Sequence, residues 1–320
     1  MATIKDVARK SGLSVSCVSK YLNHPTDVLQ STKDKIDAAI AELDFKPSVF
    51  AQSLRTKRTY IVVVLMESIV NPFFAGLFDR IRRDLELHGY ITVLQTLSDH
   101  SFNKTDFSYA DGIIICFPDS DKCIDNIHKS AGKTPIVVVH GHDTEHSLPS
   151  VLLNVGEGSG SAINYLYKSG CRSFISVGGA EKSSMSHVKV SAIKSYLCEY
   201  PDTSLQCYTG ENSYNGGIAA INFIGNNIKY TDAIICESDV LATGVISQLS
   251  ALGVSVPDEI KVIGYDDIPL ASMFNPAITT IAIPSAKMCS AACDMMLKLL
   301  AGESVENKFF NPKLVVRRTA

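Results

Sequence analysis

Short runs of β-branched and other apolar residues recur between residues 60 and 267, and they constrain the fold more than any other feature. Most of these runs are apolar at consecutive positions, as expected for parallel strands that are covered on both faces. Helical stretches separate them, and this alternation predicts an α/β fold with doubly wound parallel sheets. The predicted strands are YIVVVL, ITVLQT, ADGIIICF, PIVVVH, PSVLLN, SFISVGG, LQCYTG, AIIC and KVIGYDD, with a last short strand in NPKLVVRRTA.

The stretches between these runs have apolar residues at helical spacing. The first helix follows YIVVVL and ends at Gly89. Its inward face is predicted to hold Phe74, Leu77, Phe78, Ile81 and Leu85. The other predicted helices cover residues 158–170, 186–200, 215–225, 239–253 and 285–302. The region from 59 to 320 therefore consists of two α/β halves of similar size.

The N-terminal residues 3–23 have a different pattern, which predicts two short helices and a turn. Thr3 is a suitable N-cap, Gly12 can end the first helix with a positive φ, and Ser14 or Ser16 can cap the second. This is the helix-turn-helix pattern, whose second helix enters the major groove of DNA. An αα-hairpin at the start of any helical domain has the same spacing, so both interpretations stay open at this point.

A third helix is predicted over residues 31–45, with Ser31 as its cap. Its inner face is predicted to hold Ile36, Ala39, Ile40 and Leu43. These side chains can close a three-helix core over the first two helices. Pro47 ends the run, because proline disfavours helical geometry in the residue before it.

Residues 48–56 predict a helix of only about two turns, which is marginal alone in water. It would need DNA or a second subunit to order it. In this interpretation Leu54 inserts between base pairs from the minor groove, next to the basic Arg55. A simple linker is the alternative.

The charge distribution agrees with a basic, DNA-contacting head attached to an acidic body. Residues 1–58 hold ten Lys and Arg against six Asp and Glu, whereas residues 59–320 hold twenty against twenty-seven. The whole chain has a formal net charge of −3, which excludes a uniformly basic protein. A small basic head is what phosphate contact requires.

Nine cysteines, an odd number without a C-x-x-C pair, predict reduced thiols in a cytoplasmic protein. No apolar run is long enough for a signal peptide or a membrane span. Cys289 and Cys293 lie one helical turn apart but lack nearby His or Asp in register, which favours packing over metal binding. No metal and no cofactor is expected.

Several motifs resemble the lactose/galactose repressor (LacI/GalR) family of bacterial transcription regulators. In the head these are TIKDVA, the VS…VSKYLN run, DKI…AELDFKPS and AQSL. In the body they are NPFF at 71–74, DVLATG at 239–244, VPDEIKVIGYDD at 256–267 and NPAITTIAIP at 275–284. The body resembles a type I periplasmic binding protein, in which effector binds in a cleft between two lobes.

The resemblance implies three parts. They are a helix-turn-helix head at 1–47, a hinge helix or linker at 48–58, and an effector-binding and dimerisation core at 59–320. Within the core, lobe 1 is expected at about 59–154 and 285–304, and lobe 2 at about 155–284 and 305–320.

The resemblance also implies which residues contact DNA. Val15, Ser16 and Lys20 are expected at base edges, with Ser14, Cys17 and Ser19 near phosphates or bases. Thr3, Ser14 and Asn23 are expected at phosphates, and Leu54 and Arg55 at the hinge. Cys17 can instead be a small filler on the back of its helix. One head makes few base contacts, so a homodimer on a pseudo-palindromic operator is expected.

Effector candidates lie at strand ends, where open α/β sheets bind ligands. They are Asn71, Phe73, Phe74, Lys189, Asp239 and Asp266. An aromatic ring can stack on a sugar or base, and a carboxylate can hold hydroxyls. For the phenylalanines the alternative is core packing, and for Asp239 it is a helix N-cap.

Two departures from the family pattern bear on the effector. No helical period is present between ITVLQT and ADGIII, so a helix near residues 98–110 is expected to be missing, which would leave one side of the first sheet less covered. Where the family has R-x-x-G, this chain has Lys189-Val190-Ser191-Ala192. Lysine lacks the planar fork that holds two oxygens at once.

An effector-controlled transcription regulator, more plausibly a repressor than an activator, is therefore expected, with a sugar or sugar derivative as effector. An α/β enzyme acting on a sugar or nucleotide is disfavoured: GGAEKS at 178–183 lacks the Gly before Lys of a P-loop, and VGEGSG at 155–160 resembles a dinucleotide turn only loosely. A stand-alone solute-binding protein would not need a DNA-binding head.

Overall fold

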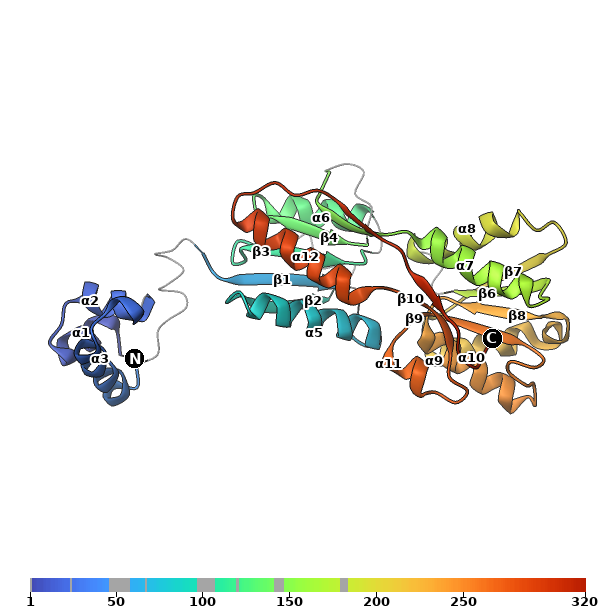
Figure 1. Cartoon of the computed structure of the whole chain (residues 1–320), viewed down its shortest axis with the longest axis horizontal. Coiled ribbons are helices and arrows are strands. Elements are labelled where there is room, and N and C mark those ends of the chain that lie inside the picture. Colours follow the sequence, from blue (N-terminus) through green and yellow to red (C-terminus); the bar gives the residue numbers. More distant parts are fainter. Residues whose placement is uncertain are drawn as a thin grey trace. The chain divides into compact units, whose positions relative to one another are not determined.

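The computed structural model describes residues 2–23, 25–45, 58–66, 68–96, 107–118, 121–140, 147–178 and 184–320. The chain forms two compact units, residues 1–60 and 61–320. Figure 1 labels most elements of each unit. The predicted hinge residues Leu54 and Arg55, and most of the stretch in which a helix was expected to be missing, lie outside the described residues.

The first unit is a three-helix head. Its helices are α1 (Ile4–Ser11), α2 (Val15–Asn23) and α3 (Gln30–Leu43), with a short 3₁₀ turn η1 (Pro25–Asp27) before α3. Its core is formed by side chains from all three helices and the residue that follows α3, namely Val7, Ala8, Val18, Ile36, Ala39 and Phe45. The predicted helix-turn-helix and its closing third helix are thus confirmed.

The ends of the head helices have clear local causes. The Asp6 carboxylate accepts hydrogen bonds from the backbone N–H and the hydroxyl of Thr3, at 3.0 and 2.7 Å. Gly12 ends α1 with a φ of 70°, as predicted. The Ser14 hydroxyl caps α2 by accepting the Cys17 N–H at 3.1 Å. The prediction that Ser31 caps α3 is wrong, because α3 begins at Gln30 and its N-cap is Leu29.

The second unit, residues 61–320, contains two six-stranded sheets. The first has the order β11-β5-β4-β3-β1-β2. Its strands are β1 (Ile61–Met66), β2 (Ile91–Thr96), β3 (Gly112–Cys116), β4 (Ile136–Val139), β5 (Ser150–Leu153) and β11 (Lys308–Phe310). All its pairings are parallel, and Val64 of β1 lies between Leu94 and Ile114. Helices α5 (Pro72–Glu86), α6 (Asp121–Ala131) and α12 (Ser285–Leu300) pack with this sheet.

The second sheet has the order β12-β10-β9-β8-β6-β7. Its strands are β6 (Ser173–Gly178), β7 (Ser204–Thr209), β8 (Ala233–Cys236), β9 (Lys261–Asp266), β10 (Thr279–Ala282) and β12 (Lys313–Val315). Only the β10–β12 pair is antiparallel. Helices α7 (Val155–Lys168), α8 (Ser184–Leu197), α9 (Tyr214–Ile224), α10 (Asp239–Ala251) and α11 (Pro269–Met273) belong to it, with a 3₁₀ segment η3 (Gly225–Tyr230).

We call the first sheet with its helices lobe 1 and the second lobe 2. The chain passes between them three times: from β5 to α7, from β10 to α12, and from β11 to β12 (Figure 1). The expected lobe boundary is wrong at one place. Residues 308–310 were expected in lobe 2, but β11 pairs in parallel with β5 of lobe 1. Of the two strands that follow α12, only β12 lies in lobe 2.

Most predicted strands and helices are confirmed, and the differences are local. The sequence patterns did not identify α6, β10 or β11 as elements. The stretch at 155–160 is the first part of α7 rather than a dinucleotide turn. On α5 the buried face contains Phe73, whereas Phe74 and Phe78 are half-buried, because the helix begins at Pro72 and turns Phe73 toward Leu77 and Ile81.

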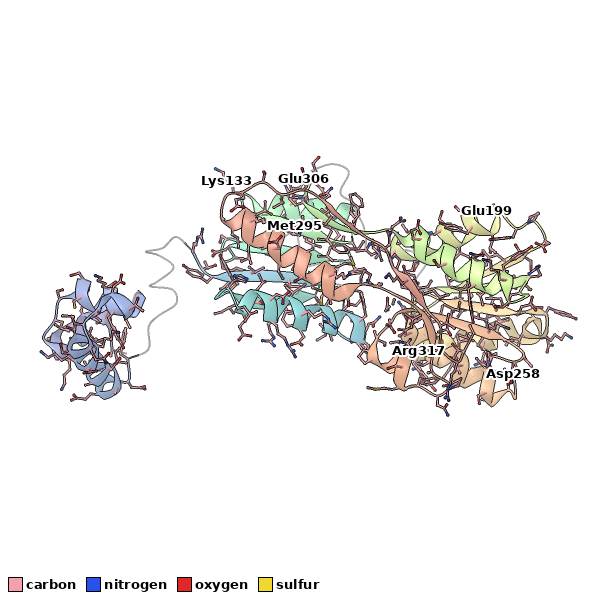
Figure 2. The ribbon with its side chains drawn as sticks, viewed as in Figure 1. Lys133, Glu199, Asp258, Met295, Glu306 and Arg317 are labelled. Carbon is pink, nitrogen blue, oxygen red and sulfur yellow. The ribbon has the colours of Figure 1, made fainter. Side chains whose placement is uncertain are left out.

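Close packing of α9 against α10 fixes the interior of lobe 2. A Cβ at Gly217 would overlap the Leu241 carbonyl oxygen, and a Cβ at Gly244 would overlap that of Tyr214. Glycine is therefore required at both positions for the helix backbones to approach. In lobe 1, α12 provides a similar cover through buried side chains such as Met295 (Figure 2). Within the described residues, no helix has both the length and the apolar character needed to cross a membrane.

Candidate DNA-binding surface and effector site

The second helix of the head presents a mixed surface to solvent. Val15, Ser16 and Lys20 are exposed on α2, whereas Val18 is fully buried against the other helices. Ser14 is exposed at the N-terminus of α2. The fold thus buries one face of α2 and leaves side chains that can reach base edges on the other.

The remaining head candidates differ in exposure. Thr3 is exposed at the start of α1, and Cys17 and Ser19 are half-buried. Because Cys17 is half-buried, its exposure does not decide between a contact with DNA and a small filler on the back of α2. Asn23 is the last residue of α2.

In the core unit, the carboxyl ends of strands from both lobes come close to one another. The imidazole Nε2 of His140, just after β4 of lobe 1, lies 3.1 Å from the sulfur of Met185 on α8 of lobe 2. The ammonium of Lys189, also on α8, acts electrostatically on His140. Carboxyl strand ends are the usual ligand sites of open α/β sheets, so this region is the candidate effector site.

Lobe 1 contributes an aromatic cluster, which we define as Phe73, Phe74, Phe117 and His140. The ring centres of Phe73 and Phe117 are 5.2 Å apart, and those of Phe117 and His140 are 4.8 Å apart, both edge-on. Phe74 completes the cluster at 5.5 Å from Phe73 and 5.8 Å from Phe117. Such pairs contribute about 0.5–1.5 kcal/mol each beyond their buried area.

The backbone holds the cluster at the sheet edge. The Asn71 side chain caps α5 by accepting the Phe73 N–H at 3.0 Å. The N–H of Phe117 donates to Val139 and that of His140 to Val151, both at 2.7 Å, so the ladder continues one residue beyond β3 and β4. Burial lowers the pKa of His140 to about 3, with a smaller contribution from the Lys189 charge. The imidazole is therefore neutral at physiological pH.

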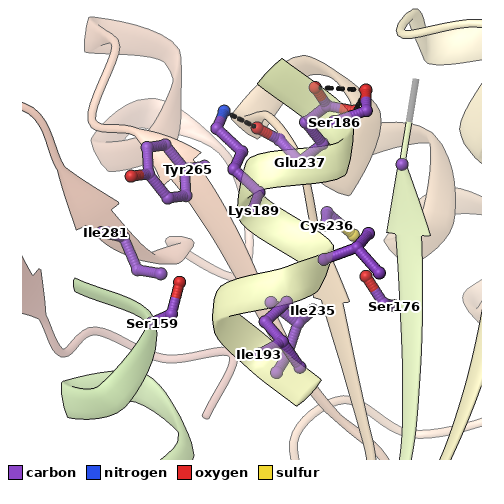
Figure 3. A pocket seen from close by; sticks show the side chains of 12 residues that line it. Ser159, Ser176, Ser186, Lys189, Ile193, Ile235, Cys236, Glu237, Tyr265 and Ile281 are labelled. Atoms are coloured by element: carbon purple, nitrogen blue, oxygen red, sulfur yellow. Dashed lines mark hydrogen bonds between the residues drawn. The ribbon is translucent and has the colours of Figure 1, made fainter. Parts of the chain in front are cut away.

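Lobe 2 contributes a polar wall, which we define as Ser186, Lys189, Glu237, Tyr265 and Asp266. The Lys189 ammonium donates to the Glu237 carbonyl oxygen at 2.9 Å and lies 3.8 Å from the centre of the Tyr265 ring. The Ser186 hydroxyl lies 2.7 and 2.6 Å from the two carboxylate oxygens of Glu237 (Figure 3). These contacts fix the Lys189 ammonium against the Glu237 backbone and the Glu237 carboxylate against Ser186.

Asp266 ends β9 and is buried, with 8% of its surface exposed. Burial raises the pKa of its carboxyl well above the usual range, and the charges of Asp239 and Glu237 act in the same direction, whereas the Lys189 ammonium opposes them. Its side chain therefore lies at a strand end where the charges of Lys189, Asp239 and Glu237 all act on it.

Asp239 plays a different part, because it lies deeper and its oxygens are already occupied. One oxygen accepts the Thr280 hydroxyl at 2.6 Å and the other accepts the Ile268 N–H at 2.9 Å. Burial raises the pKa of Asp239 to about 7. The N-cap of α10 is Ser238, not Asp239. Asp239 therefore joins α10 to β10 and to the chain after β9.

A small cavity lies beneath the polar wall, between α8 and the second sheet. Ser159, Ser176, Ile193 and Cys236 line it together with Lys189, Glu237 and Tyr265 (Figure 3). It leaves about 10 Å³ for water-sized spheres, which is about one water molecule. The buried hydroxyl of Tyr265 has no hydrogen-bond partner among the described residues.

Three of these strand-end residues have a positive φ although none is glycine. The values are 52° for Phe117, 54° for His140 and 106° for Asp266. Non-glycine residues in this region are strained, and such strain concentrates at functional sites. The two lobes thus share this feature at their facing strand ends.

The structure brings Phe73, Phe74, Lys189 and Asp266 to this region and places Asp239 behind it. The sequence patterns missed Phe117, His140, Ser186, Glu237 and Tyr265. All but Ser186 lie at or next to a carboxyl strand end, so the strand-end rule could have found those four had it been applied to every strand.

Two family models match the chain. Residues 3–48 match the bacterial regulatory proteins of the lacI family, and residues 163–320 match the periplasmic binding protein-like domain. The two matches correspond to the head and to most of lobe 2, with α12, β11 and β12.

Relatives span the whole chain. The HTH-type transcriptional repressor PurR of Photobacterium profundum is 27% identical over 330 residues, which covers 100% of this chain and 98% of the relative. The HTH-type transcriptional repressor CytR of Escherichia coli is 25% identical over 327 residues, covering 99% and 95%. Both are named as repressors and not as enzymes.

Solved structures show the same fold. A Lac repressor dimer bound to operator and the anti-inducer ONPF gives a TM-score of 0.89 at 22% identity, covering 99% of this chain and 98% of that one. A complex of the transcriptional regulator CelR with cellobiose gives 0.72 at 21%, covering 100% of both chains. This chain belongs to the lacI family of bacterial regulatory proteins, which are DNA-binding transcription regulators with a helix-turn-helix head and a periplasmic binding protein-like core.

Proposed function

We propose that this chain is a homodimeric, cytoplasmic transcriptional repressor that binds a pseudo-palindromic operator and is controlled by a sugar or sugar derivative bound between its lobes. The observation that carries the proposal is the exposed face of α2, with Val15, Ser16 and Lys20, on a head with its own core. A head with its own core whose second helix is exposed in this way can enter a DNA major groove, and a stand-alone solute-binding protein or an enzyme does not need such a head.

On the DNA side, Val15, Ser16 and Lys20 contact base edges and Ser14 contacts a phosphate. Lysine commonly reads guanine, serine is tolerant, and the valine methyl groups can contact a thymine methyl. Cys17 and Ser19 flank this face, and Thr3 and Asn23 lie near the backbone. Leu54 enters the minor groove beside Arg55 when two hinges meet on DNA.

On the effector side, the aromatic cluster of lobe 1 and the polar wall of lobe 2 hold the ligand. Phe73 and Phe74 supply apolar rings, Lys189 and Asp266 supply polar contacts, and Asn71 and Asp239 support the backbone around them. The effector controls DNA binding only through a difference in its affinity for two states of the core.

The first test is a selection of DNA duplexes from a random pool by the full chain at moderate ionic strength, followed by fluorescence anisotropy. The expected result is an enriched pseudo-palindrome whose affinity falls steeply with salt, because bound phosphates release counterions. Equal affinity for the enriched and random duplexes would overturn the proposal.

The second test is a thermal-shift screen of sugars, sugar derivatives and nucleobases on the full chain. A ligand that binds the folded core raises its melting temperature by mass action. Operator binding measured again with each hit then distinguishes an inducer from a corepressor.

A further inference from the structure

The polar wall of lobe 2 carries its own counter-charge, and this limits the effectors that it can accept. We propose that Glu237 is a specificity residue that restricts the site to uncharged effectors with hydrogen-bond donors and excludes phosphorylated ones. The inference rests on the proposed function, because it concerns the ligand of the same site.

The Lys189 ammonium is held against the protein. It donates to the Glu237 carbonyl oxygen at 2.9 Å, and it lies over the Tyr265 ring at 3.8 Å, within the range of a cation–π contact. These contacts hold the ammonium against the protein and leave it fewer free N–H donors for an anion. Lysine also lacks the fork that would let it keep one partner while binding two oxygens of a phosphate.

Within the described part of the chain, the wall holds two carboxyls, those of Glu237 and Asp266, and one ammonium, that of Lys189. The Glu237 carboxylate is anchored by the Ser186 hydroxyl, at 2.7 and 2.6 Å from its two oxygens, so it is fixed beside the Glu237 carbonyl that Lys189 contacts (Figure 3). The buried Asp266 is influenced by both Lys189 and Glu237. If Asp266 is protonated, the three groups sum to zero charge, and if it is ionised they sum to −1.

A phosphate group carries about −1.5 to −2 charges at neutral pH. It would therefore meet a wall of the described residues that has no net positive charge. The aromatic cluster of lobe 1 does not compensate, because burial and the Lys189 charge keep His140 neutral and its other members are phenylalanines.

A neutral ring with hydroxyl or amine groups meets the opposite conditions. Its apolar face can lie on the aromatic cluster of lobe 1. Its donors can approach the Asp266 carboxyl at the end of β9, where Lys189 and Glu237 act on the same group. Uncharged sugars and nucleosides have this chemistry.

The test is calorimetric titration of the full chain with inorganic phosphate at constant ionic strength. The wild-type chain is expected to show no saturable binding. Glu237→Gln keeps the acceptor for Ser186 but removes the charge, and it is expected to gain saturable phosphate binding. Adding Lys189→Met to Glu237→Gln should abolish this gain.

Glu199→Gln is the matched control, because it removes the same charge at an exposed position after α8 (Figure 2). Phosphate binding by the Glu237 variant no tighter than by the Glu199 variant would overturn the proposal. So would saturable phosphate binding by the wild-type chain that Lys189→Met removes, and this comparison does not depend on the Glu237 variant folding.

A phosphorylated sugar that stabilises the wild-type chain more than its uncharged parent in the thermal-shift screen would also overturn the specificity role. Operator binding by the same proteins separates the two claims. Failure to select any duplex counts against the proposed function, whereas the phosphate titration counts only for or against the role of Glu237.

Discussion

Lobe 1 and lobe 2 have the same strand order and differ in what they place at their strand ends. At one edge of each sheet lies the second strand of the lobe, β2 in lobe 1 and β7 in lobe 2, paired with the first strand. At the other edge lies a C-terminal strand, β11 in lobe 1 and β12 in lobe 2. Lobe 1 places aromatic rings after β3 and β4. Lobe 2 places Lys189, Glu237 and Asp266 at the corresponding region.

This difference shows how one framework produces two kinds of surface. Both lobes have strand-end residues with a positive φ, Phe117 and His140 in lobe 1 and Asp266 in lobe 2, so they share this backbone conformation. The side chains on it determine whether the surface interacts through dispersion or through charge. A ligand between the lobes is selected by both surfaces at once, since it must offer an apolar face to one and polar groups to the other.

The largest effect is expected from removing a ring of lobe 1. Phe117→Ala should lower the free energy of unfolding by about 4 kcal/mol, because the buried ring contacts Phe73, Phe74 and His140. Urea denaturation of the full chain measures it. Phe309→Ala is the control, since Phe309 is 71% exposed and should cost less than about 0.5 kcal/mol. A loss below 1 kcal/mol for Phe117→Ala would show that the cluster does not hold the sheet edge.

A smaller effect with a pH signature is expected in lobe 2. Asp239→Ala leaves the Thr280 hydroxyl and the Ile268 N–H without acceptors and should cost about 3 kcal/mol near pH 5. The folded pKa of Asp239, about 7, is above the unfolded value of 3.8, so the wild type loses stability as pH rises from about 4 to 7. The difference between wild type and variant should therefore shrink toward pH 8.

The control for this series is Asp258→Ala, which removes an exposed carboxylate of lobe 2. Its effect should stay within about 0.5 kcal/mol at every pH. A pH-independent cost for Asp239→Ala would contradict the buried, protonatable role of this residue.

The opposite pH dependence is expected at His140 in lobe 1. Its pKa in the folded state is about 3, below the ordinary 6.5. The free energy of unfolding is therefore highest above pH 6.5 and decreases as the pH falls from 6.5 toward 3. Between pH 8 and pH 5 the loss should be about 2 kcal/mol. His140→Gln should remove this part of the profile, and His88→Gln, at an exposed position, should not. Identical profiles for wild type and His140→Gln would refute the assignment.

The smallest effect is expected in the head, where the lobes are not involved. Lys20→Ala should weaken binding to the selected duplex by about 1.4 kcal/mol, a factor of ten, with unchanged stability, because Lys20 is exposed on α2. Anisotropy titrations on the selected duplex and on single-base variants measure it. An equal loss on all duplexes would assign Lys20 to the phosphates instead of a base.

Sequence patterns predicted the head and most of the core for identifiable physical reasons. Apolar runs such as AIIC follow from burial on both sides, and β8 has those bounds. Helix α6 was missed because its apolar residues are few and polar side chains surround them. Strand β11 was missed because it has only three residues, whose exposed and half-buried side chains form no apolar run. It belongs to lobe 1 because the chain returns to that lobe after β10, a connection that a local pattern does not show.

The candidate site was predictable in part. Phe73 and Asp266 were found because they sit beside recognisable motifs. Phe117, His140 and Glu237 follow ordinary strands, and their roles depend on contacts between segments far apart in sequence, such as His140 with Met185. A pattern within one segment cannot reveal such pairs.

The most direct test of the account is the reciprocal coupling between the two proposed ligands. The affinity of the full chain for its selected operator is measured by anisotropy with and without a saturating hit from the screen, and the affinity for the hit is measured with and without operator. The account predicts that both affinities change by the same factor, about tenfold or more. Operator affinity that is unchanged by every ligand bound in the core would contradict it.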